Sequence, residues 1–169
     1  MGAMQFSLGI VLFGAILLAL LITIAVIDLR RMIIPDGLNL GLAATGIGYQ
    51  VWTLGRFPVI AVVFSLAVLS LFWVLRRWFE LTRGQTGLGL GDVKMAGASV
   101  LWISPWNLAL YMLITCVAAL MFVLLSHFRG GALELKTKVP FGPFLGLGIF
   151  VTWILEISGM PTFIPDGGN

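Results

Sequence analysis

The segment GLGLGDVKMAG, residues 87–97, brings a carboxylate and an ammonium, Asp92 and Lys94, to the start of an apolar run. A second carboxylate, Asp28, follows a long apolar stretch near the N-terminus. Charged side chains in such segments are costly and usually functional. If the two aspartates converge, they can share one proton, so that one acts as base and the other as acid. Such a pair could hydrolyse an amide, because the ionised carboxylate activates a water while the protonated one polarises the carbonyl.

The sequence offers few residues for cysteine-based or metal-based catalysis. The single histidine, His127, and the single cysteine, Cys116, lie about three helical turns apart in one apolar run, too far apart for the hydrogen bond that activates a thiolate. One histidine and no acidic cluster at ligand spacing offer little to a metal. We therefore expect no metal and no organic cofactor. The basic residues show no patch interleaved with aromatic residues, which argues against a nucleic-acid partner.

Composition indicates what must position the two aspartates. The mean hydropathy is +1.09 and only 10% of residues are charged, against about a quarter in soluble domains. A span needs about 20 apolar residues. The sequence therefore predicts an all-α, polytopic membrane helix bundle in a lipid bilayer, forming one domain over residues 1–169. Its expected spans, the fourth irregular, are 7–27, 37–55, 57–75, 88–103, 106–126 and 141–158.

The basic residues orient this bundle. Nine of the ten Lys and Arg residues fall on one predicted side, and only Arg56 falls on the other. Cytoplasmic loops carry such an excess of positive charge. We therefore expect both termini to face away from the cytoplasm, and Asp28 and Asp92 to lie at the cytoplasmic boundary. The nine residues are Arg30, Arg31, Arg76, Arg77, Arg83, Lys94, Arg129, Lys136 and Lys138.

Glycines precede the second aspartate. Gly89 and Gly91 lack a Cβ, so an extended peptide or a facing helix can approach the backbone beside Asp92. They also weaken the start of the helix, which leaves unpaired backbone groups for an unwound substrate.

Three segments together resemble a known family. IDLRRMIIPD (27–36), GLGDVKMAG (89–97) and VPFGPFLGLG (139–148) look like the three signatures of type IV prepilin peptidases, the bacterial members of the GxGD membrane aspartyl peptidases. The motifs follow in the family's order and spacing. GxGD alone would be weak, whereas three ordered motifs on a six-span scaffold are specific.

The resemblance implies an activity and a set of residues. Family members cut the leader from prepilins and pseudopilins after a glycine, at the cytoplasmic face of the bacterial inner membrane, where pilus or secretion machinery is a further partner. Asp28 and Asp92 correspond to the catalytic pair. The other motif residues are expected to bind substrate or support the site: Gly89, Gly91, Lys94, Asp36, Pro140, Phe141, Gly142 and Pro143.

One departure from the family pattern is clear. Larger members carry a cytoplasmic domain with a tetracysteine zinc site between their first two helices, associated with N-methylation of the new N-terminus. This sequence has one cysteine and no such insertion. It is similar to the short peptidases of tight-adherence (Flp-type) pilus systems, and the resemblance does not extend to methyltransferase activity.

Alternatives stay open for several residues. Asp36 is expected to cap the second helix. Lys94 could mark the membrane interface, stabilise Asp92 as the anion, or bind acidic groups of the substrate. Residues 140–143 could break the start of the last span or line the site. The rival functions are a small proton-coupled transporter that uses Asp28 and Asp92 as a relay, and a structural subunit of a secretion or pilus machine.

Overall fold

The computed structural model describes residues 2–84, 87–128 and 140–159, and within these ranges the chain is helical without a β-strand. The all-α prediction is therefore confirmed. An α-helix lies in each of the six predicted spans, and in the fourth, irregular one it is short and followed by a 3-10 turn. The elements are α1 (Gly2–Arg31), α2 (Asp36–Leu54), α3 (Val59–Arg83), α4 (Leu90–Ser99), the 3-10 turns η1 (Val100–Trp102) and η2 (Pro105–Asn107), α5 (Leu108–Phe128) and α6 (Gly142–Ile157).

Helix α3 extends beyond the predicted end of its span at residue 75 and stops at Arg83. The extension is polar on one side, where Glu80 pairs with Arg76 at 2.9 Å and with Arg77 at 3.5 Å. Pairs at these spacings stabilise a helix that has left the apolar region. The helix ends at Gly84, whose φ of 64° is in the left-handed region that glycine adopts easily.

The connection from α1 to α2 is short. Met32 follows α1 with a φ of 54°, and its N–H donates to the carbonyl of Asp28 at 2.8 Å. Pro35, in extended conformation, then occupies the N-cap position of α2. No side chain caps this helix by a hydrogen bond, so the expectation that Asp36 is the cap was wrong. The fixed ring of Pro35 orients the chain there, and Asp36 is instead the first residue of the helix.

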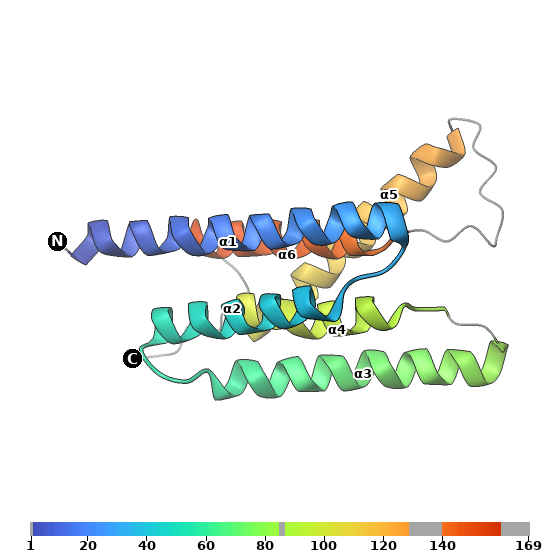
Figure 1. Cartoon of the computed structure of the whole chain (residues 1–169), viewed down its shortest axis with the longest axis horizontal. Helices are drawn as coiled ribbons and strands as arrows, with labels where there is room; N and C mark the ends of the chain where they lie inside the picture. Colours follow the sequence, from blue (N-terminus) through green and yellow to red (C-terminus); the bar gives the residue numbers. More distant parts are fainter. Residues whose placement is uncertain (1, 85–86, 129–139, 160–169) are drawn as a thin grey trace.

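The helices form a bundle in which α1 lies beside α6, and α2 lies beside α4 (Figure 1). Helix α3 packs on α4, and α5 packs along α6. All residues from Met95 to Ile103 are buried. Protein therefore surrounds the short α4 and the 3-10 turn that follows it, and irregular backbone at membrane depth is tolerated in that setting.

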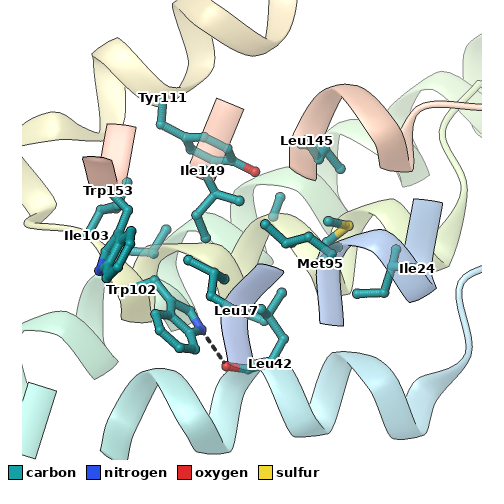
Figure 2. Packing of buried hydrophobic residues seen from close by; sticks show 14 of the residues in the cluster. Leu17, Ile24, Leu42, Met95, Trp102, Ile103, Tyr111, Leu145, Ile149 and Trp153 are labelled. Atoms are coloured by element: carbon teal, nitrogen blue, oxygen red, sulfur yellow. Dashed lines mark hydrogen bonds between the residues drawn. The ribbon is translucent and has the colours of Figure 1, made fainter. Parts of the chain in front are cut away.

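One apolar core joins the helices. The side chains labelled in Figure 2 come from α1, α2, α5, α6 and the α4 region, and they belong to one buried cluster. The Trp102 indole stacks on Tyr49 with ring centroids 5.6 Å apart, and its Nε1–H donates to the carbonyl of Leu42 at 2.8 Å. A Cβ on Gly46 would lie 2.8 Å from this indole, so the glycine permits the close approach of α2.

The outer surface is apolar. Large hydrophobic side chains are exposed along α1, α3 and α5, as they are on a protein solvated by lipid rather than water. Three stretches are long and apolar enough to cross a membrane, Leu8–Arg31, Val59–Arg83 and Pro105–Ser126, and α6 is a shorter apolar helix. These features agree with a membrane helix bundle. That all six helices cross the bilayer stays a prediction.

Candidate active site

The packing brings both aspartates to the same end of the bundle. Leu21 of α1 and Met95 of α4 both lie beside Gly146 of α6, where an added Cβ would be 3.7 Å and 3.9 Å from them. Asp28 is two helical turns beyond Leu21, in the direction in which α1 ends. Asp92 is about one turn before Met95, where α4 begins. The end of α1 and the start of α4 therefore meet at one end.

The two carboxylates interact electrostatically. A charge on Asp28 acts on Asp92, so each lies within range of the other's field. Helices α2 and α6 each pack against both α1 and α4, and they hold the two aspartate-bearing helices in place. Two like charges in a partly desolvated site disfavour double ionisation, which is the arrangement that acid–base chemistry by two aspartates requires.

Asp28 is held by the start of α6. The carboxyl group is buried, and its Oδ2 accepts a hydrogen bond from the N–H of Gly142 at 2.9 Å. Gly142 is the first residue of α6, where N–H groups have no partner within the helix and the helix dipole favours a negative charge. A Cβ at this position would lie 2.8 Å from Oδ2, so only glycine fits without moving the aspartate.

Asp92 lies in the first turn of α4, which begins after the N-cap residue Gly89. Its carboxylate turns back toward that glycine, because a Cβ on Gly89 would lie 2.5 Å from Oδ2 of Asp92. Its Oδ1 is buried and has no hydrogen-bond partner among the described residues. A buried acceptor without a partner is costly, so this oxygen is available to a water or a substrate group.

One oxygen of each carboxylate lies against the backbone of a motif glycine. Oδ2 of Asp28 accepts the N–H of Gly142, and Oδ2 of Asp92 would lie 2.5 Å from a Cβ on Gly89. These contacts restrict the orientation of the carboxyl groups without adding another charged side chain. The sequence placed Gly89 and Gly142 in the motifs but did not predict these contacts.

The predicted close approach at Gly91 is present, and the approaching segment is the chain's own. A Cβ on Gly91 would lie 2.9 Å from the Cβ of Ile34 and 3.3 Å from its backbone N and O. The connection between α1 and α2 therefore packs directly on the start of α4. Gly89 itself is exposed.

Lys94 and Asp36 form an ion pair with each other. The Lys94 Nζ lies 2.7 Å from Oδ1 of Asp36, whose side chain is 77% exposed. The lysine thus joins the N-terminal half of α4 to the first turn of α2. Since Asp36 is paired and exposed while Asp28 is buried beside α6, the structure favours Asp28 as the partner of Asp92.

Asn39 was missed by the sequence analysis. It is buried on α2, its Nδ2 donates to the carbonyl of Gly91 at 3.2 Å, and its Oδ1 has no partner among the described residues. The available signal was its place one turn after Asp36, as an amide in an otherwise apolar stretch.

Residues 140–143 start α6. Phe141 is the N-cap residue, and its carbonyl accepts the N–H groups of Phe144 and Leu145, each at 3.1 Å. Pro143 lies in the first turn, where the missing N–H costs nothing. The last helix therefore begins within this segment, two residues after the half-buried Pro140. A substrate-binding role for this segment stays a prediction.

An apolar hollow lies beside the segment that leads to Gly89. Its volume is about 290 Å³, and its lining residues come from the end of α3 and from positions 87–88. A Cβ on Gly87 would lie 2.6 Å from the Phe79 ring, so the ring packs against the backbone there.

In the described ranges, no group of three His, Cys, Asp or Glu side chains could hold a metal ion. The expectation of no metal stays a prediction.

Fold and site together define an all-helical membrane bundle with two interacting carboxylates at one end. Comparison with known proteins gives the family. Residues 15–124 match the type IV leader peptidase family, and the chain belongs to that family. It is therefore an integral membrane protein.

Curated relatives are identical to it at about a third of the aligned residues. A prepilin leader peptidase/N-methyltransferase of Burkholderia pseudomallei (strain 1026b) is 32% identical over 154 residues, which cover 90% of this chain and 48% of the relative. A protein with the same description from Pectobacterium carotovorum is 33% identical, over 83% of this chain and 50% of the relative. One from Aeromonas hydrophila is 32% identical, over 93% of this chain and 53% of the relative. The chain thus spans about half the length of these relatives. No solved structure matches it.

Proposed function

We propose that this chain is a membrane aspartyl endopeptidase that cleaves the leader peptide from type IV prepilin-like precursors. The observation that carries the proposal is the convergence of Asp28 and Asp92, each with one carboxylate oxygen against the backbone of a motif glycine. The descriptions of the relatives, as prepilin leader peptidases, support the substrate class. The relatives are also described as N-methyltransferases, and the proposal covers the hydrolysis alone.

The chemistry follows from the two carboxyl groups. With one proton shared between them, the ionised aspartate takes a proton from a water, and the resulting hydroxide attacks the scissile carbonyl. The protonated aspartate donates a hydrogen bond to the carbonyl oxygen as it becomes negative. The leaving amine then receives a proton from the carboxyl group that took one from the water. This route uses no metal and no organic cofactor.

We further propose that all six helices cross the bacterial inner membrane as one domain over residues 1–169, with the site at the cytoplasmic face and both termini on the other side. Basic residues support this orientation. Arg30 and Arg31 end α1, three arginines lie near the end of α3, and Lys94 lies near the start of α4. Figure 1 shows these three helix ends at the same end of the bundle. Arg129, Lys136 and Lys138 lie outside the described residues.

The location of the aspartates also favours hydrolysis over a proton relay. A transporter would place its carboxylates near the middle of the membrane, at broken helices. Asp28 is in the last turn of α1 and Asp92 is in the first turn of α4. In that position the substrate's own apolar helix can lie in the bilayer beside the bundle, while its leader junction reaches the site. The proposed partners are therefore the precursor, the lipid bilayer and the machinery that assembles the mature subunits.

The test is cleavage of a purified prepilin precursor by the purified protein in detergent or liposomes. We expect the wild type to cleave after the glycine at the leader junction, and Asp28→Asn and Asp92→Asn to abolish cleavage while keeping helix content and elution volume. Asp36→Asn is the matched control, because this aspartate lies at the same end of the bundle as Asp28 and Asp92 but its side chain is exposed. Loss of activity only in Asp36→Asn and Asp92→Asn would assign the pair differently. No cleavage by folded wild type would reject the proposal.

A further inference from the structure

The start of α4 is attached to α2 at a specific backbone group. The Nδ2 of Asn39 donates to the carbonyl oxygen of Gly91 at 3.2 Å. This carbonyl belongs to the peptide unit that joins Gly91 to Asp92, so the amide holds the plane that contains the nitrogen of Asp92. Asn39 is 5% exposed, and water therefore competes little for this bond.

Packing alone does not account for an amide here. The Oδ1 of Asn39 is buried without a partner in the described part of the chain, and a buried unpaired acceptor is destabilising. A leucine, whose side chain has the same number and branching of heavy atoms, would not carry that cost. What the amide adds is the donor to Gly91.

Asn39 also connects to the other aspartate. Residues 32–35 link the helix of Asp28 to α2, and Ile34 of this linker packs on Gly91. The backbone N–H of Asn39 donates a hydrogen bond to the carbonyl of Pro35 at 3.3 Å. The linker and the Asn39 side chain are therefore connected through the first turn of α2. That turn is thus joined both to the linker that follows Asp28 and to the peptide unit that precedes Asp92.

We propose that Asn39 is a positioning residue that fixes Asp92 relative to Asp28 by holding the Gly91–Asp92 peptide unit. This inference rests on the proposed peptidase function. Small displacements in an acid–base pair cost rate rather than substrate affinity, because binding energy from the rest of the substrate is unaffected.

The chain offers a matched control at the far end of α4. There the Nε2 of Gln50, also on α2, donates to the carbonyl of Ile103 at 3.4 Å. Asn39→Leu and Gln50→Leu each remove one hydrogen bond from a side-chain amide of α2 to a backbone carbonyl of the α4 segment. Only the bond made by Asn39 lies beside Asp92. If Asn39→Leu does not fold, Asn39→Asp keeps the shape of the side chain and removes the amide donor.

The experiment measures kcat and KM for a purified prepilin precursor in detergent, with the thermal midpoint of each variant. We expect Asn39→Leu to lower kcat about tenfold to a hundredfold with KM within about twofold of wild type, and Gln50→Leu to leave both constants unchanged. Wild-type kcat in the Asn39 variants, or equal losses in the Asn39 and Gln50 variants, would overturn the positioning role and leave the peptidase function standing. A folded wild type without activity would reject the function, and the inference with it.

Discussion

The N–H of Gly142 donates a hydrogen bond to Oδ2 of Asp28 across 114 residues of sequence. The first residue of the last helix thus orients a carboxylate at the end of the first helix. Because helix N-termini have unpaired N–H groups, this bond satisfies the backbone of α6 and the buried aspartate at once. The position of Asp28 therefore depends on where α6 begins.

Gly142→Ala is predicted to impair activity more than stability. The new Cβ would lie 2.8 Å from Oδ2 and 3.2 Å from Cγ of Asp28, so the carboxyl group must move. We expect kcat to fall about tenfold or more, because a displacement of a few tenths of an ångström to 1 Å disturbs an acid–base pair. Precursor cleavage and a thermal unfolding midpoint check this.

Gly37→Ala is the control for that change. Gly37 is also in the first turn of a helix, and a Cβ there would meet nothing within 4 Å. Since alanine is favoured over glycine in helices, we expect wild-type activity and a gain of up to about 1 kcal/mol in stability. Equal activity in both alanine variants would contradict the role of Gly142.

Asp36→Asn is predicted to have a small effect. Its partner Lys94 lies 2.7 Å away, but the Asp36 side chain is 77% exposed, and such ion pairs contribute less than about 1 kcal/mol. We expect cleavage within a few-fold of wild type and a midpoint shift that shrinks in high salt. An inactive but folded Asp36→Asn protein would show that this aspartate takes part in the chemistry.

Met32→Gly is predicted to be more stable than Met32→Ala. Met32 has a φ of 54°, a left-handed conformation that costs a residue with a Cβ roughly 1 kcal/mol. Both variants lose the same partly exposed side chain, so their difference in unfolding midpoint reports the backbone conformation. In an ordinary helix alanine would be the more stable of the two, and that order would contradict the strained turn after Asp28.

Glu156→Ala is predicted to destabilise the opposite end of the bundle. The Oε1 of Glu156 accepts the N–H of Ser104 at 2.8 Å and a bond from the Asn107 side chain. Removing the acceptor leaves two donors unpaired, at a cost of about 1–3 kcal/mol, whereas Glu156→Gln keeps an oxygen there and should cost less. Cleavage per folded molecule is expected to stay at the wild-type level, since Asp28 and Asp92 lie at the other end. A selective loss of kcat in folded Glu156→Ala would contradict that separation.

The helices were predictable from local properties. Long apolar stretches and the glycines and prolines between them determine where the helices lie, because backbone hydrogen bonds close within each helix and apolar side chains avoid water. The extension of α3 to Arg83 was missed, since its Arg76–Glu80 pair stabilises helix where hydropathy has already fallen. The motif positions of Asp28 and Asp92 also follow from the sequence.

What only the tertiary structure decided is how those residues are held. That Gly142 binds Asp28, that Lys94 pairs with Asp36, and that Asn39 holds the peptide unit before Asp92 are contacts between helices far apart in sequence. Hydropathy and periodicity report which face of a helix avoids water, but not the rotation and height at which two helices pack. Those depend on interlocking side chains and on glycines such as Gly46 and Gly91, where one backbone approaches its neighbour.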